Sequence, residues 1–194
     1  MSKFIPFIDL DKQQKRLGDK INNRINSVLA HGKYIMGPEV NELEKKLELY
    51  TGANYVATCA SGTDALLLSL MAYGIGPGDI VFCPTFTFPA TAEAIVILGA
   101  IPYFIDIEND TFNISIQSLK QGIKNVKKEN KYQTKAIIAV DLYGLPADYN
   151  KLNTIAKENN MVLIADAAQS FGAEYFDNKV GAIADITCIS FFPS

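Results

Sequence analysis

The 194-residue chain is 48% hydrophobic and 20% charged, a composition typical of a globular domain that can bury one sizeable core. Its formal net charge of −3 argues against general affinity for nucleic acid, because a surface that follows phosphates needs an excess of Lys and Arg. No apolar run is long enough to span a bilayer, and residues 1–6 lack the apolar stretch of a signal peptide, so we expect a cytoplasmic protein without membrane contacts.

Helical spacing of apolar residues marks the N-terminal part of the chain. It extends over residues 11–30 and predicts one amphipathic helix, followed by a turn at residues 31–33. Pro38 suits a first helical position and Glu39 complements the helix dipole. These two residues predict a second helix that ends before Gly52.

Beyond Gly52, short β-branched or aromatic runs alternate with helical stretches. The expected strands are residues 55–59, 80–83, 102–107, 136–140, 162–165 and 186–191. The expected helices are residues 65–73, 90–98, 116–123 and 149–159. Strands that alternate with helices predict an α/β fold, in which a mostly parallel sheet is sandwiched by helices. The chain reads as one domain or as the larger part of one.

The first candidate site follows the expected strand 55–59. Ligands of open α/β sheets bind beyond the carboxyl ends of the strands, so polar residues at these positions are candidate contacts. Ser61, Gly62 and Thr63 open the next helix, where backbone N–H groups and hydroxyls can receive a phosphate. The alternative is simple capping of that helix by Ser61 or Thr63.

The second candidate site begins at Asp166, which ends the expected strand 162–165. A carboxylate there can form a salt bridge with a protonated pyridine nitrogen, or it can be the N-cap of the segment that follows. Gln169 can donate or accept a hydrogen bond at a ring oxygen, or it can complete a capping box. One ligand carries both a phosphate and a pyridine ring, pyridoxal 5′-phosphate (PLP).

Aromatic residues follow the expected strand 80–83. Phe88 could stack on a planar ring, whereas a place in the buried core is the alternative for both Phe86 and Phe88. His31 is the only histidine, and its place before a glycine favours a helix C-terminal residue over a catalytic base.

Other motifs give weaker signals. The three cysteines show no CxxC spacing and lie in or beside apolar runs, so we expect structural packing for Cys59, Cys83 and Cys188. No G-x-G-x-x-G, Walker A, H-E-x-x-H or G-x-S-x-G pattern occurs, which weakens the dinucleotide, nucleoside triphosphate, zinc protease and hydrolase interpretations. No metal site is expected.

Six segments, in order and spacing, resemble the DegT/DnrJ/StrS sugar aminotransferases, which are fold-type I PLP enzymes of the aspartate aminotransferase superfamily. They are GPEV at 37–40, SGTDAL at 61–66, FTFPAT at 86–91, LYG at 142–144, DAAQS at 166–170 and SFFPS at 190–194. The resemblance covers nearly the whole chain. One departure is Asp141, where relatives commonly carry His or Ser.

The resemblance assigns six residues of this chain to the cofactor. They are Gly62, Thr63 and Ser190 at the phosphate, Phe88 stacked on the ring, Asp166 at the ring nitrogen and Gln169 at the ring hydroxyl. The Schiff-base lysine of the family would come directly after Ser194, outside this sequence. Residues 1–194 would then be the N-terminal part and PLP-binding large domain of an aspartate aminotransferase-like transferase, and the C-terminal small domain would lie outside them.

Within the family, residues 7–10, 34–40 and 190–194 look most similar to enzymes that aminate carbon 3 of UDP-2-acetamido-2-deoxy-3-oxo-glucuronate with L-glutamate as amino donor. The implied function is PLP-dependent transamination of a nucleotide-linked keto sugar for surface polysaccharide or lipopolysaccharide biosynthesis, in a homodimer with shared active sites. Two alternatives remain. One is a PLP-dependent nucleotide-sugar dehydratase with histidine in place of the lysine, and the other is a non-enzymatic PLP-binding regulator.

Overall fold

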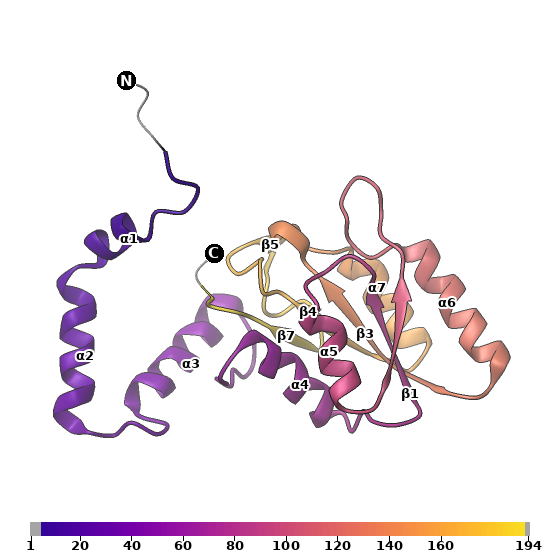
Figure 1. The fold of residues 1–194 in the computed structure, drawn as a ribbon, viewed down its shortest axis with the longest axis horizontal. Helices are drawn as coiled ribbons and strands as arrows, with labels where there is room; N and C mark the ends of the chain where they lie inside the picture. The colour runs from indigo at the N-terminus through magenta and orange to yellow at the C-terminus, as the bar shows by residue number, and fades with distance from the viewer. Residues whose placement is uncertain (1–4, 193–194) are drawn as a thin grey trace.

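The computed structural model describes residues 5–192, and its centre is a five-stranded parallel sheet with the strand order β2-β1-β3-β4-β7 (Figure 1). The strands are β1 (Asp79–Pro84), β2 (Ile101–Ile105), β3 (Gln133–Val140), β4 (Val162–Asp166) and β7 (Ile186–Cys188). A hairpin of β5 (Glu174–Tyr175) and β6 (Asn178–Lys179), which the sequence pattern did not predict, follows β4. The beginning of segment 1–6 and the end of segment 190–194 lie outside the described residues.

Helices cover both faces of this sheet. The helices are α1 (Leu10–Leu17), α2 (Asp19–His31), α3 (Pro38–Thr51), α4 (Gly62–Ala72), α5 (Ala90–Ile97), α6 (Ile116–Glu129) and α7 (Tyr149–Glu158), with a 3₁₀ turn at Leu142–Gly144. Phe82 of β1 packs in a core cluster with residues of α6 and α7, whereas its neighbour Val81 packs with residues of α4 and α5. Successive strand residues point to opposite faces, so the two cores follow from the alternation in the strands. The predicted α/β sandwich is confirmed.

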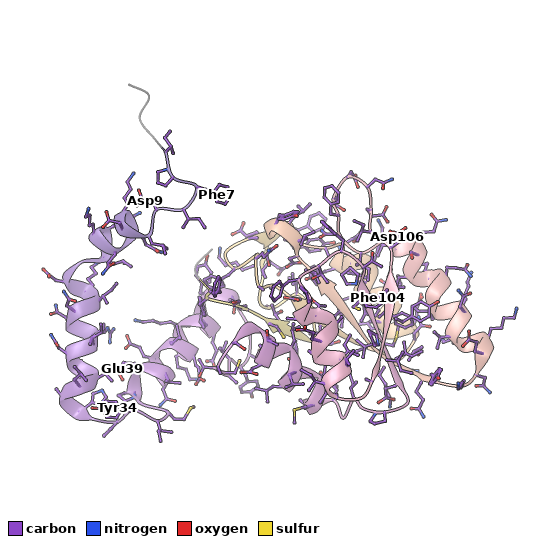
Figure 2. All side chains as sticks on the ribbon, in the orientation of Figure 1. Phe7, Asp9, Tyr34, Glu39, Phe104 and Asp106 are labelled. Carbon is purple, nitrogen blue, oxygen red and sulfur yellow. The ribbon has the colours of Figure 1, made fainter. Side chains whose placement is uncertain are left out.

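The N-terminal helical segment differs from its prediction. The expected single helix over 11–30 breaks at Gly18, whose φ of 42° ends α1 and starts α2. Neither helix buries a residue, and Phe7, labelled in Figure 2, is fully exposed on the part of the chain that leads into α1. The two terminal guanidinium nitrogens of Arg24, Nη1 and Nη2, donate to Glu42 at 2.8 and 2.7 Å and connect α2 to α3. No helix among residues 5–192 is long and apolar enough to cross a membrane.

Residues 55–59 form no strand, so that prediction was wrong. Their backbone groups are engaged by α3 instead: Glu44 accepts hydrogen bonds from the Thr58 N–H (2.8 Å) and hydroxyl (2.9 Å), and Glu48 accepts one from the Val56 N–H (3.4 Å). The segment is extended but bonded to carboxylates rather than to a neighbouring strand. Cys59 is consequently exposed, which corrects the expectation that all three cysteines are packed.

Candidate functional site

Asp166 is the last residue of β4 and only 7% exposed. Its Oδ2 accepts a hydrogen bond from the Thr91 hydroxyl at 2.8 Å, and its Oδ1 accepts a long one from the Ala168 N–H at 3.4 Å. Within residues 5–192 it makes no ion pair with a Lys, Arg or His. Burial raises the pKa of Asp166, and the two hydrogen bonds oppose that rise. The site therefore offers a buried carboxylate that can receive a cationic donor.

Asp166 and Gln169 lie at a turn rather than at the start of a helix. The residues after Asp166 form turns and no helix begins there, so the capping-box alternative for Gln169 is wrong, and Asp166 caps only a turn, through its long contact with the Ala168 N–H. Gln169 instead accepts a hydrogen bond at Oε1 from the Tyr143 N–H, at 2.6 Å. Tyr143 has a φ of 54° and Gly144 a φ of 87°, and this left-handed turn brings the loop after β3 against Gln169. The amide nitrogen of Gln169 is left to donate outward.

Asp141, directly after β3, is the second buried carboxylate of this region. Its N–H donates to the Asp166 carbonyl oxygen at 3.1 Å. Its carboxylate accepts from the Tyr149 hydroxyl (2.7 Å), the Ser170 hydroxyl (2.7 Å) and the Ala147 N–H (3.0 Å). Burial raises the pKa of Asp141, these donors lower it, and the Asp166 charge raises it. Asp141 thus joins the loop after β3 to the turn after β4.

The N-terminus of α4 lies against the end of the chain segment that follows β7. The Ser61 hydroxyl accepts a hydrogen bond from the Asp64 N–H at 3.0 Å, so the capping interpretation holds for Ser61. The N–H groups of Gly62 and Thr63 belong to the first turn and have no intrahelical partner. A Cβ on Gly62 would be 3.0 Å from the Ser190 Cβ. A glycine therefore allows the helix start and the Ser190 hydroxyl to lie side by side.

Strand pairing brings the Ser190 region and Asp166 to the same edge of the sheet. Cys188 of β7 is the register partner of Asp166, and its carbonyl oxygen accepts a hydrogen bond from the Ala167 N–H at 2.8 Å. Ser190 lies two residues beyond Cys188 in the chain. Five of the six predicted residues, all except Phe88, are thus connected through α4, β7 and β4.

Phe88 lies in the loop between β1 and α5 and is 72% exposed. Its carbonyl oxygen accepts a hydrogen bond from the Thr91 N–H at 3.2 Å, so it sits one turn before the residue that holds Asp166. Phe86 is about half exposed and packs its ring against Phe112, with 5.9 Å between centroids. The buried-core alternative is wrong for both, and Phe88 presents an open aromatic ring.

Residues outside this edge behave as structural groups. His31 is the last residue of α2, as expected, and its Nε2 lies 3.0 Å from a carboxylate oxygen of Glu39. Cys83 and Cys188 are buried, and burial raises the pKa of each thiol to about 12. The sequence motifs did not indicate the roles of Thr91 and Tyr149, whose hydroxyls donate to the two buried carboxylates. Thr91 stands in the FTFPAT segment, and its spacing of four from Thr87 was the available signal.

Comparison with known proteins places this arrangement among aminotransferases. Residues 15–194 match the DegT/DnrJ/EryC1/StrS aminotransferase family. The UDP-2-acetamido-2-deoxy-3-oxo-D-glucuronate aminotransferase of Pseudomonas aeruginosa is 48% identical over 190 residues, which are 98% of this chain and 51% of that protein. The chain thus spans about half the length of the curated relatives it matches.

Solved structures share the same backbone. A DegT DnrJ EryC1 StrS aminotransferase from Brucella abortus superposes with a TM-score of 0.96 at 45% identity, over 98% of this chain and 51% of that one. The ntda protein of Bacillus subtilis, solved with bound cofactor PMP (pyridoxamine 5′-phosphate), gives 0.83 at 34% identity, over 100% of this chain and 42% of that one. The predicted family is confirmed, and this chain belongs to the DegT/DnrJ/EryC1/StrS aminotransferase family.

Proposed function

We propose that this chain is the PLP-binding part of a sugar aminotransferase, which moves an amino group from L-glutamate to the keto carbon of a nucleotide-linked sugar. The observation that carries the proposal is the buried Asp166 carboxylate, which has no cationic partner within residues 5–192 and lies at the same sheet edge as the start of α4. When bound, PLP supplies an electron sink that allows an amino group to move between two carbons.

The start of α4 fits the cofactor phosphate. The free N–H groups of Gly62 and Thr63 and the positive end of an 11-residue helix favour a dianion. Ser190 adds a hydroxyl from the segment after β7, and its contact with Gly62 leaves no room for a side chain between helix and hydroxyl. These three residues would hold the phosphate as a rigid anchor.

The other end of the site fits the ring. Asp166 would accept a hydrogen bond from the protonated ring nitrogen. The negative carboxylate and the positive ring would stabilise each other in this buried site, so the proton would stay on the ring. Phe88 presents an exposed aromatic face for stacking. Gln169, oriented by the Tyr143 N–H, would donate its amide hydrogen to the ring hydroxyl oxygen.

The proposed sugar substrate is UDP-2-acetamido-2-deoxy-3-oxo-glucuronate, with amination at carbon 3. The 48% identity to the Pseudomonas aeruginosa enzyme that carries this substrate in its name supports the choice. The product would enter surface polysaccharide or lipopolysaccharide biosynthesis in the cytoplasm. We also propose a homodimer with shared active sites and a lysine directly after Ser194, which separates a transaminase from a dehydratase with histidine there.

The test is amino transfer by the full-length protein loaded with PLP. L-Glutamate and the UDP-linked 3-oxo uronic sugar should yield 2-oxoglutarate and the 3-amino sugar, both measured by mass spectrometry. A 4-oxo-6-deoxy sugar nucleotide is the control and should remain unchanged. Turnover of the control alone would keep the reaction and refute the sugar, whereas a protein that neither binds PLP nor transfers nitrogen would refute the function.

A further inference from the structure

A chain of three side chains links α5 to the end of β4. Thr91 lies in the first turn of α5, is fully buried, and places its Oγ1 2.8 Å from Asp166 Oδ2 across 75 residues of sequence. The Thr87 hydroxyl lies 3.0 Å from the same Thr91 oxygen. Each of these distances is within the range of a good O–H···O hydrogen bond.

The number of protons available decides which hydroxyl donates in each of these two hydrogen bonds. A threonine hydroxyl has one proton to donate, and an ionised carboxylate can only accept. With Asp166 ionised, the Thr91 proton must point at Asp166, so the Thr87 proton must point at Thr91. Both hydroxyls are therefore oriented toward the carboxylate, and each polarises the next.

We propose that Thr91 is a positioning residue for Asp166, and that Thr87 supports Thr91. We call these two hydrogen bonds, from Thr87 to Thr91 and from Thr91 to Asp166, the threonine relay. Thr91 fixes Oδ2 toward α5, which leaves Oδ1, with only its long contact to Ala168, as the oxygen that faces a ligand donor. The inference deepens the proposed function, on which its consequence for catalysis rests.

The surroundings of Asp166 provide few groups, apart from the Thr91 hydroxyl, that stabilise its ionised form. The titratable groups that face it are Asp141 directly after β3, Tyr149 of α7 and Cys188 of β7, and none of these is a cation. Burial disfavours the ionised carboxylate, and the donors that favour it are Thr91 and Ala168. Because the Ala168 contact is long, the Thr91 hydroxyl is the stronger of the two.

The test compares Thr91→Val, which keeps the shape but lacks the hydroxyl, with Thr91→Ser, which keeps the hydroxyl. In the PLP-free protein, NMR titration of ¹³C-labelled aspartate carboxyls should show a higher Asp166 pKa in the valine variant and a return toward wild type in the serine variant. In the PLP-loaded protein, kcat should fall about tenfold or more with valine and recover with serine, the effect expected for loss of one charge-assisted hydrogen bond.

Thr87→Val provides a second test if Thr91→Val fails to fold, because Thr87 is only half buried. It should raise the Asp166 pKa by a smaller amount than Thr91→Val does. Two results would overturn the threonine relay. One is an Asp166 pKa in the folded valine variants that equals the wild-type value, and the other is a kcat of Thr91→Ser as low as that of Thr91→Val. If the Asp166 pKa shifts as expected but the protein does not take up added PLP, the role of Thr91 is supported and the proposed function is refuted, so the two failures are distinguishable.

Discussion

Two carboxylates lie next to each other at the centre of the site, and their hydrogen bonds separate their roles. Asp141 accepts three short hydrogen bonds, whereas Asp166 accepts one short and one long bond. A buried charge is costly unless donors or a counter-charge compensate it. Asp141 is satisfied by the protein, so its role is to join two loops. Asp166 has the spare acceptor capacity that a ligand can use.

Replacement of Asp166 by Asn should separate binding from catalysis. The amide oxygen can still accept the Thr91 hydrogen bond, so the fold and PLP uptake should survive. A neutral amide cannot hold the ring nitrogen protonated, and we expect amino transfer to slow by about a hundredfold or more, as for loss of a preorganised charge. Steady-state rates and visible absorbance measure the two effects. Asp177→Asn, at an exposed position, is the control, and wild-type rates in Asp166→Asn would reject this role.

Asp141 should make stability depend on pH. Its pKa in the folded protein is raised from 3.8 by burial, so the folded state binds this proton more tightly than the unfolded state does. The stabilisation from this group is complete below the unfolded pKa and is lost as pH rises through the folded pKa. Asp141→Asn cannot titrate. The unfolding free energy of wild type, relative to this variant, should therefore fall as pH rises from acid toward neutral.

Urea unfolding of both proteins at a series of pH values measures this difference. Tyr149→Phe removes one donor but keeps the carboxylate, so its pH dependence should be steeper than that of wild type. Parallel curves for wild type and Asp141→Asn would show that burial does not perturb this group.

At the scale of elements, α3 is held to the rest of the molecule at a few defined contacts. Glu44 and Glu48 bind the backbone of the segment that leads to α4, and the C-terminal residue Thr51 packs against Gly181 after β6. A Cβ on Gly181 would lie 2.5 Å from the Thr51 Cβ, and Gly181 has a φ of 130°. The position of α3 determines where α4 begins, and so where the proposed phosphate contacts lie.

Gly181→Ala should therefore destabilise the protein by two mechanisms. The left-handed backbone disfavours a side chain by about 1–2 kcal/mol, and the clash with Thr51 adds about 1–3 kcal/mol as overpacking. Gly74→Ala is the matched control, because Gly74 has a φ of 65° but open space around its Cβ position, so only the first cost applies. Thermal and urea unfolding measure both variants. Equal losses would show that the contact between Thr51 and Gly181 adds nothing to the cost of the substitution.

At the scale of the whole molecule, the sequence predicted what depends on local pattern. The buried strand that ends at Asp166 and the helix that starts at Pro38 lie where periodicity and composition placed them. The interactions that escaped prediction join distant segments. The hydrogen bond from the Thr58 N–H to Glu44 takes the place of a strand pairing, and the hydrogen bond from Thr91 to Asp166 spans 75 residues. Neither interaction can be read from residues that are neighbours in the sequence. Such contacts depend on tertiary packing, which overrides local preference.

The two N-terminal helices carry exposed apolar surface that assembly could cover. Neither α1 nor α2 buries a residue, although Ile25 and Leu29 are large apolar residues that stand more than half exposed. Apolar surface of this kind is normally covered in the working protein. We expect the full-length protein to be a homodimer by sedimentation, with each site completed by the neighbouring subunit. Both helices belong to the surface that assembly should cover.

Mixing two inactive variants tests the shared site. One carries Asp166→Asn, and the other is altered at a residue that reaches across the interface. In a mixed dimer, one site has an intact Asp166 from the second subunit and an intact crossing residue from the first, so it should work. Random mixing of equal amounts should restore about a quarter of the wild-type activity, because half of the dimers are mixed and each has one good site. A monomer by sedimentation, with no recovery on mixing, would show that each chain completes its own site.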